Sequence, residues 1–391
     1  MKRPPIPYAR QSISDQDIEA VRDVLKSDFL TQGPEVERFE ALLCDATESR
    51  YAVAVSSATA ALHLAMLAMG TEDPGLVWTS PNTFVATSNA ALYCRAKVNF
   101  IDIDLGTLNI SADALETRLR EAELLGALPT MVVPVHFGGV RPEMERIWEL
   151  SKRYGFRVLE DASHALGSLY QGRPLAKDSK SDAMVLSFHA IKNVTTGEGG
   201  AVITDDPDID ERVRALRTHG VTRDPNRMIR PSEGPWYYEQ QALGFNYRMT
   251  DIQAALGSSQ LGRLSKFIEK RNEIARFYNE QFADLPIRTQ VVPSGCRSAY
   301  HLFVAWIDGP SASDRRRRWF EFLRASGIGV NVHYIPVYEQ PYYRDQGPFF
   351  PCPNMDRYYA GTLTLPMHTN LDQAQLESIV LKVREGLASI L

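Results

Sequence analysis

The chain has 391 residues, of which 44% are hydrophobic, so it can bury a large core. Its formal net charge of -5 argues against a protein that binds a nucleic-acid backbone, because such proteins normally carry a basic face. Residues 1–10 lead into no apolar stretch, and no run of about 18 apolar residues occurs, so we expect a cytoplasmic protein without a membrane span. The four cysteines form no metal-type or redox-type pair, so we expect no metal site.

Short apolar runs alternate with helical patterns from residue 51 to about residue 220. The first pair is a buried strand over 51–57 and a helix over 58–70, which ends at Gly70. Strands that are apolar throughout and separated by helices predict a mainly parallel, mixed sheet with helices on both faces. In such sheets ligands bind beyond the carboxyl ends of the strands. Further strands are expected over 76–80, 97–104, 130–137, 156–162, 183–190 and 200–206, with helices over 83–95, 111–123, 142–155 and 208–220 between them.

The rest of the chain has a different pattern. Residues 221–245 contain a cluster of helix and strand breakers and predict a long functional loop, and a helical pattern then runs from 250 to about 282. Strand patterns over 301–307 and 328–337 alternate with helical patterns over 314–327 and the last twenty residues. We therefore expect an N-terminal segment and large α/β domain over 1–250, a connecting long helix over 251–284 and a small α+β domain over 285–391.

The sequence VSSATAAL, residues 55–62, follows the first predicted strand. Ser57 and Thr59 place hydroxyl groups at the start of an apolar helix, and Ala58 is small enough to allow close approach of a ligand to the backbone. Helix N-termini bind phosphate through free N–H groups and the helix dipole. An ordinary helix cap is the alternative interpretation.

The sequence VLEDASHA, residues 158–165, places Asp161 at the end of a buried strand. An unpaired carboxylate is costly there, and a protonated pyridine nitrogen is one cation that could pair with it. A helix-capping aspartate is the alternative. His164 could stack or hydrogen-bond nearby, or could be a structural histidine.

The sequence SFHAIKNVTTGEGG, residues 187–200, places Lys192 just beyond another buried strand. With an ordinary pKa of about 10.4, a lysine is a poor nucleophile unless its surroundings or a carbonyl cofactor change its reactivity. A surface lysine in a hairpin is the alternative. Together, an amine, a carboxylate and an anion site at the strand ends of one sheet are what pyridoxal phosphate requires.

These segments resemble those of the DegT/DnrJ/EryC1/StrS sugar aminotransferases, a family of fold-type I pyridoxal-phosphate enzymes. The resemblance covers essentially the whole chain and includes KSDFLTQGP (26–34), SPNTFVAT (80–87), GFNYRMTDIQAALG (244–257) and VNVHYIPVY (330–338). It implies that Lys192 forms the Schiff base and carries protons, and that Asp161 pairs with the pyridine nitrogen. It further implies cofactor contacts from Ser57, Ala58, Thr59, Phe84, His164 and Ser187, with Asn246 reaching the phosphate from the other subunit of a homodimer with shared active sites.

Within the family, the chain is most similar to the aminotransferases of pseudaminic acid biosynthesis. The similarity implies a UDP-linked 4-keto-6-deoxy sugar as substrate and L-glutamate as amino donor. It places nine residues against the sugar nucleotide: Tyr8, Asp28, Phe29, Leu30, Thr31, Val332, His333, Tyr334 and Ile335.

Other functions remain open on the sequence alone. Another UDP- or dTDP-linked keto sugar could be the substrate. A dehydratase on the same fold is disfavoured, because the relatives that became dehydratases carry histidine where this chain has Lys192. A non-catalytic regulator that binds the cofactor would keep the phosphate site without turnover. A serine hydrolase would need a G-x-S-x-G turn, which the sequence lacks.

Overall fold

The computed structural model describes residues 5–71, 75–177, 180–230 and 233–390. Within these residues, seven strands form a central sheet of order β1-β9-β8-β5-β4-β2-β3. Only β9 among these strands is antiparallel to its neighbours, so the expected mainly parallel, mixed sheet is confirmed. The strands are β1 (Tyr51–Val55), β2 (Leu76–Thr79), β3 (Lys97–Phe100), β4 (Met131–Val133), β5 (Arg157–Asp161), β8 (Ala183–Ser187) and β9 (Gly200–Thr204).

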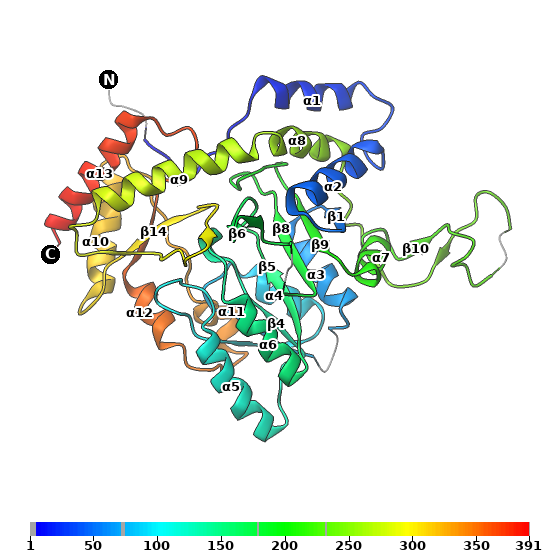
Figure 1. Ribbon diagram of the computed structural model, residues 1–391, viewed down its shortest axis with the longest axis horizontal. Coiled ribbons are helices and arrows are strands. Elements are labelled where there is room, and N and C mark those ends of the chain that lie inside the picture. Colours follow the sequence, from blue (N-terminus) through cyan, green and yellow to red (C-terminus); the bar gives the residue numbers. More distant parts are fainter. Residues whose placement is uncertain (1–4, 72–74, 178–179, 231–232, 391) are drawn as a thin grey trace.

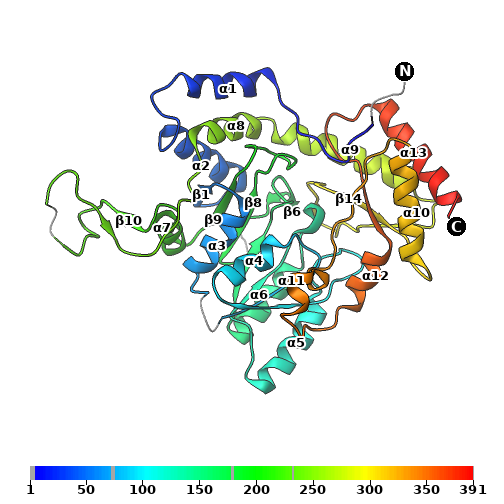
Figure 2. The same ribbon diagram turned by 180° about the vertical axis from the view of Figure 1, so that it is seen from behind.

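Helices pack on both faces of this sheet (Figures 1 and 2). Because successive strand residues point to opposite faces, Val77 and Trp78 of β2 enter different cores. One face is covered by α3 (Ala58–Ala68), α4 (Ala86–Tyr93) and α7 (Pro207–Leu216). The other face is covered by α2 (Pro34–Thr47) and α8 (Asp251–Leu261) over β1, β9 and β8, and by α5 (Ala112–Leu125) and α6 (Met144–Tyr154) over the remaining strands.

Local sequence signals set the ends of these helices. The side chains of Ser57, Ser111 and Thr250 accept hydrogen bonds from backbone N–H groups in the first turns of α3, α5 and α8. Gly126 and Gly155 end α5 and α6 in the left-handed conformation, which glycine adopts without steric cost. The capping residues therefore explain why each helix begins directly after a strand or loop.

The long helix expected over 250–282 is in fact two helices, α8 and α9 (Leu264–Gln281). Gly262 and Arg263 form a turn between them. Glycine has a low helix propensity, and the Arg263 side chain binds the Ser12 carbonyl oxygen and the buried Asp17 carboxylate instead of extending along a helix surface.

The C-terminal part of the chain contains a small antiparallel sheet with its own core. Strands β12 (Arg288–Thr289), β14 (Phe303–Trp306) and β15 (Thr362–Leu365) form the sheet, and α9, α10 (Ala312–Ala325) and α13 (Gln373–Ala388) pack around it. A further core cluster joins Phe100 and Phe137 of the larger part to Trp306 and Tyr358 of this part. The division into domains at residues 250 and 284 stays a prediction.

The predicted strand over 328–337 was wrong. In this segment only Ile328 and Asn331 form bridges, which pair with Ile6 and Thr364. Ile328 and Val330 are nevertheless buried in the C-terminal core. The alternating apolar pattern therefore reflects side-chain burial alone, since the backbone does not follow a neighbouring strand.

The segment over 221–245 contains a two-stranded hairpin rather than a loop without secondary structure. Strands β10 (Val221–Thr222) and β11 (Glu239–Gln240) pair at its base, and the described residues between them, 223–230 and 233–238, project away from the rest of the molecule (Figures 1 and 2). Ile229 and Trp236 on this projection are 85% and 70% exposed. We call residues 221–240 the arm.

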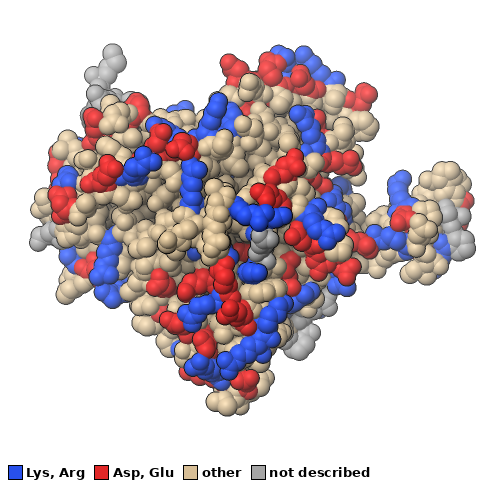
Figure 3. Space-filling model, in the orientation of Figure 1, with Lys and Arg blue, Asp and Glu red and all other residues tan. Residues whose placement is uncertain are grey.

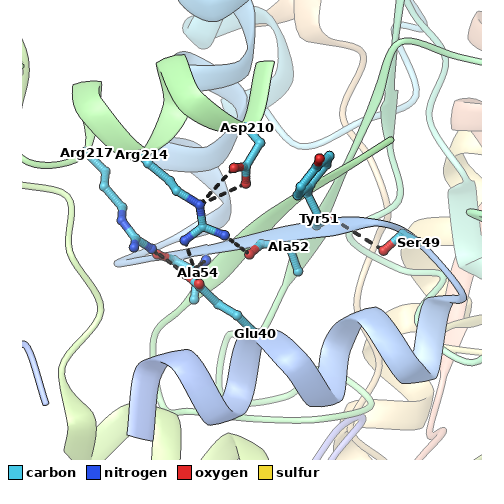
Figure 4. A network of polar contacts seen from close by, with 8 residues as sticks. All are labelled: Glu40, Ser49, Tyr51, Ala52, Ala54, Asp210, Arg214 and Arg217. Atoms are coloured by element: carbon cyan, nitrogen blue, oxygen red, sulfur yellow. Dashed lines mark hydrogen bonds and ion pairs between the residues drawn. The ribbon is translucent and has the colours of Figure 1, made fainter. Parts of the chain in front are cut away.

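Side chains cover the outer edge of β1, the first strand of the central sheet. The Ala54 N–H group donates to Glu40 Oε1 at 2.9 Å, while Arg214 and Arg217 donate to the carbonyl oxygens of Ala52 and Ala54 at 3.0 and 2.7 Å (Figure 4). Glu40 also pairs with both arginines at 2.7 and 2.5 Å. The network satisfies backbone groups that an edge strand would otherwise leave unpaired.

The remaining elements are short or lie at the periphery. On the face shown in Figure 3, acidic and basic side chains are interspersed without a large basic area. Among the described helices, none is both long and apolar enough to cross a membrane. These elements are α1 (Asp15–Leu25), α11 (Pro341–Arg344), α12 (Pro353–Gly361), the 3-10 turns Phe137–Gly139 and Val337–Glu339, and the strands β6 (Leu169–Tyr170), β7 (Arg173–Pro174) and β13 (Cys296–Arg297).

Candidate active site

A cavity of about 570 Å³ lies where the central sheet's strands end, at their carboxyl edge. Residues that follow β1, β2, β4, β5 and β8 line it, and Tyr8 and residues 331–334 line it from the N-terminal segment and the C-terminal part. This is the position that the mainly parallel sheet predicts for a ligand.

The start of α3 forms one wall of the cavity. Ser57, Ala58 and Thr59 all line it, and Ser57 caps the helix by accepting from the Ala60 N–H group at 3.1 Å. Gly200 of β9 packs directly behind this turn, because a Cβ atom there would lie 2.5 Å from the Ala58 nitrogen. Glycine at this position allows the helix to begin close to the sheet, with its N-terminal N–H groups facing the cavity edge, and such groups bind phosphate.

Asp161 ends β5 and is 5% exposed. Its Oδ2 accepts from Thr87 Oγ1 at 2.7 Å, and its Oδ1 accepts from the Ser163 N–H group at 3.1 Å. Thr87 is in turn hydrogen-bonded to Thr83 at 2.7 Å. In the described part of the chain no lysine or arginine forms an ion pair with Asp161, so this buried carboxylate is free to pair with a cationic ligand.

Lys192 lies in the turn between β8 and β9, and its side chain lines the same cavity. Burial lowers the pKa of Lys192 to about 8, although the Asp161 carboxylate opposes that decrease. A much larger fraction of this amine is therefore neutral at pH 7 than for a lysine in water, and the neutral amine is the nucleophilic form.

Three buried histidines surround the lysine and the aspartate. The His164 and His301 rings lie 4.5 Å apart, and His301 Nε2 lies 3.5 Å from Lys192 Nζ. Burial, followed by the Lys192 charge, holds the pKa of His164 and of His301 well below the usual value. Burial likewise lowers the pKa of His333 to about 3, so these rings are neutral at pH 7.

The aromatic side chains of the cavity offer flat surfaces for a ring. Phe84 is 60% exposed although it lines the cavity, and its ring centroid lies 6.4 Å from that of Tyr334. The Tyr334 hydroxyl group lies 3.3 Å from His164 Nε2, and the Tyr8 ring lies 5.8 Å from the His333 ring.

The cavity thus contains most of the residues that the sequence singled out. It is lined by Tyr8, Ser57, Ala58, Thr59, Phe84, Asp161, His164, Ser187, Lys192, Val332, His333 and Tyr334. The exposed residues Asp28, Phe29, Leu30 and Thr31, between α1 and α2, do not line it, and neither do Ile335 and Asn246. Sequence reasoning missed Thr83, Thr87 and His301. Thr87 and His301 contact Asp161 and Lys192, which are distant in the chain, and Thr83 takes part only through Thr87.

The donor set fits a phosphorylated pyridoxal. It combines a lysine of lowered pKa, a buried carboxylate without a cationic side-chain partner among the described residues, a helix N-terminus and an exposed aromatic ring. These features belong to residues that lie far apart in the sequence and are joined by the fold.

Comparisons with known proteins point to one family. The model of the DegT/DnrJ/EryC1/StrS aminotransferase family matches residues 11–384. A Campylobacter jejuni protein named UDP-4-amino-4,6-dideoxy-N-acetyl-beta-L-altrosamine transaminase is 38% identical over 97% of this chain and 98% of its own. The spore coat polysaccharide biosynthesis protein SpsC of Bacillus subtilis is 37% identical over 97% of this chain and 96% of its own.

Solved structures agree with this result. PseC of Helicobacter pylori, described as an aminotransferase involved in the biosynthesis of pseudoaminic acid, has a TM-score of 0.89 at 30% identity and matches over 98% of this chain and 100% of its own. Spr1654 of Streptococcus pneumoniae, solved in PMP and PLP forms, has TM-scores of 0.89 and 0.88 at 26% identity, with coverage of 99% of this chain and 100% of its own.

Proposed function

Because the chain belongs to the DegT/DnrJ/EryC1/StrS aminotransferase family, we propose that it aminates a UDP-linked 4-keto-6-deoxy sugar with L-glutamate as amino donor. The protein is a pyridoxal-phosphate-dependent sugar aminotransferase. The proposed substrate is UDP-2-acetamido-2,6-dideoxy-beta-L-arabino-hex-4-ulose, and the product is its 4-amino sugar. The names of the Campylobacter relatives and of the Helicobacter structure support this choice.

One observation carries the proposal: Lys192, Asp161 and the start of α3 line a single cavity. Lys192 would hold the cofactor covalently, Asp161 would pair with its ring nitrogen, and Ser57, Ala58, Thr59 and Ser187 would bind its phosphate. Phe84 would stack on the ring and His164 would lie beside it. When bound, pyridoxal phosphate supplies the carbonyl group that exchanges amines and a ring that withdraws electrons from the neighbouring carbon.

The chain's own residues then handle protons. With its pKa lowered to about 8, Lys192 Nζ takes a proton from the carbon that bears the amine and holds it for delivery to a neighbouring carbon. Because the amine is tethered beside the reacting atoms, this transfer is effectively intramolecular. The hydrogen bonds from Thr87 and the Ser163 N–H group fix the orientation of the Asp161 carboxylate, which would pair with the ring nitrogen of the cofactor.

The sugar nucleotide enters beside Tyr8, Val332, His333 and Tyr334, which line the part of the cavity formed by the N-terminal and C-terminal segments. Asn246 and residues 28–31 are exposed and lie outside this protomer's cavity. We infer that the chain forms a homodimer in which these residues of each subunit contact the active site of the other subunit. The exposed Ile229 and Trp236 of the arm support such an association.

Two measurements test the function. The purified protein is mixed with L-glutamate and a panel of UDP- and dTDP-linked 4-keto sugars, and the products are identified by mass spectrometry and NMR. An amino sugar formed from the proposed UDP sugar supports the assignment. A deoxy sugar, or turnover confined to another nucleotide, contradicts it.

The Lys192→Ala variant should lose the visible absorbance of the lysine-bound cofactor and at least about 100-fold in turnover, because the tethered base is removed. Lys266→Ala, at an exposed position on α9, is the matched control and should keep both. Steady-state amino transfer by Lys192→Ala at the wild-type rate would refute the role of Lys192.

A further inference from the structure

His301 lines the same cavity as Lys192, and the proposed function gives it no role. It precedes β14, is 4% exposed and lines the cavity, and its Nε2 atom lies 3.5 Å from Lys192 Nζ. This distance is at the long end for a hydrogen bond, and catalytic hydrogen bonds are often long before substrate binds. Within the described residues its other ring nitrogen, Nδ1, has no hydrogen-bond partner.

A buried arginine forms hydrogen bonds with the backbone at His301. Arg271 of α9 donates through one nitrogen to the carbonyl oxygens of Tyr300, His301 and Met367, at 3.0, 3.3 and 3.0 Å. Ring contact with His164 orients the imidazole itself. The ring is therefore held rigidly, and the only side chain to which it is hydrogen-bonded in the described structure is Lys192.

We propose that His301 is a positioning residue that accepts a hydrogen bond from the Lys192 ammonium group through Nε2. This contact holds Nζ in place and stabilises its proton in the interval between the carbon that gives the proton and the carbon that receives it. The proton is taken from carbon and returned to carbon, so His301 stays neutral and no net charge is left. The role in catalysis rests on the proposed function, whereas the hydrogen bond does not.

The surrounding charges fit an acceptor rather than a second base. His301 faces Lys192, Arg271 and the rings of His164 and His333. Burial and the charges of Lys192 and Arg271 disfavour a positive charge on its ring, and the two neutral histidines do not favour one. Asp161 favours the charge on Lys192 instead. A proton shared between the two groups therefore stays on Nζ, and a neutral acceptor that binds the charged form of an amine raises that amine's pKa.

The test compares His301→Phe, which keeps a ring without an acceptor, with His301→Gln, which keeps an acceptor near the position of Nε2. The full-length chain freed of cofactor is labelled with acetic anhydride across a pH series, and mass spectrometry follows the peptide that contains Lys192. The wild-type midpoint should lie at the lowered pKa of about 8. Surface lysines in the same sample are the internal reference.

In His301→Phe the midpoint should fall to a pH lower by about 1, a tenfold change in the acid dissociation constant, because the ammonium loses its acceptor. In His301→Gln it should stay near the wild-type position. An unchanged midpoint in His301→Phe overturns the proposal, and so does a Gln variant that behaves like the Phe variant. If the Phe variant does not melt cooperatively, His301→Asn, whose amide is too short to reach Nζ, takes its place.

A second readout uses the holoenzyme in a single turnover with L-glutamate. His301→Phe should lower the rate constant about 100-fold through misplacement of Nζ, should raise the isotope effect of 2-deuterated glutamate and should leave the apparent KM unchanged. A changed KM with an unchanged rate constant contradicts a role in proton transfer. If the labelling midpoints shift as expected but no keto sugar is aminated, the hydrogen bond is supported and the proposed function is rejected. If a keto sugar is aminated but the midpoint of His301→Phe is unchanged, only the role of His301 is rejected.

Discussion

Several buried histidines of this molecule have lowered pKa values. Burial lowers the pKa of His333 to about 3 and that of His368 to about 4, and it depresses the pKa of His164 and of His301 as well. Each ring therefore takes up a proton more readily in the unfolded chain than in the folded one.

We expect the free energy of unfolding to fall as the pH is lowered below about 6.5, the ordinary pKa of histidine. Below that pH the unfolded chain binds protons that the folded chain excludes, so stability is retained above 6.5 and is lost progressively towards the folded-state values near 4 and 3. Each such histidine contributes a slope of at most about 1.4 kcal/mol per pH unit.

Urea unfolding at pH 7.5, 6.5 and 5.5 measures this dependence in the wild type and in His333→Gln. The variant cannot take up the proton at position 333, so its loss of stability towards low pH should be shallower. A variant with the same slope as the wild type would show that His333 does not contribute.

The roles of residues could be predicted from the sequence only where a reactive or charged side chain stands at the end of a predicted strand. Ser57 and Asp161 stand at the ends of predicted strands and Lys192 stands just beyond one, and the parallel sheet brings such positions to one edge. His301 carried no such signal, because its partner lies 109 residues away and the contact depends on how the C-terminal part packs. Residues 28–31 and Asn246 follow the family pattern but lie outside one protomer's cavity.

At the scale of elements, the apolar strands and amphipathic helices of residues 51–220 could be predicted because both sheet faces are buried. Patterns outside this region were less informative. The alternation over 328–337 reports burial without strand pairing, and the helical pattern over 250–282 does not reveal the turn at Gly262. In both cases tertiary contacts decide the backbone conformation.

The network around Glu40 provides a test at this scale. Glu40→Gln should lower the free energy of unfolding by about 2–3 kcal/mol, because two arginines and the edge of β1 lose a buried carboxylate. Since β1 leads directly into the start of α3, affinity for pyridoxal phosphate should also decrease.

Urea unfolding and a titration with the cofactor measure the two effects. Glu121→Gln, which breaks an exposed pair with Arg118 on α5, is the control and should change stability by less than about 0.5 kcal/mol. Equal effects of the two substitutions would mean that the β1 edge does not depend on Glu40.

At the scale of the whole molecule, the arm carries exposed apolar side chains that the packing of a single subunit does not account for. Its described residues project from the body (Figure 1). Its Ile229 and Trp236 side chains are exposed to solvent. Such side chains are normally buried in an interface. The sequence indicated only a long loop here, because the breaker residues hide the short pairing of β10 with β11.

Trp236→Ser should therefore weaken the proposed homodimer by about 10- to 100-fold in dissociation constant, since aromatic residues dominate the energy of interfaces. Analytical ultracentrifugation over a concentration series measures this. Leu124→Ser, at an 88% exposed position on α5, removes a comparable exposed apolar side chain and should have no effect. A dimer of unchanged affinity in Trp236→Ser would exclude the arm from the interface.

The cavity unites Tyr8, near the beginning of the polypeptide, with Tyr334, near its end. The Ile6 N–H group donates to the Gly327 carbonyl oxygen at 2.8 Å, and the Met367 N–H group donates to the Tyr8 carbonyl oxygen at 2.9 Å. A chain still emerging from the ribosome lacks one wall of this cavity until residues 331–334 have been synthesised. A product truncated before residue 331 would therefore keep Lys192 and Asp161 but would lack the wall of the cavity that we assign to the sugar nucleotide.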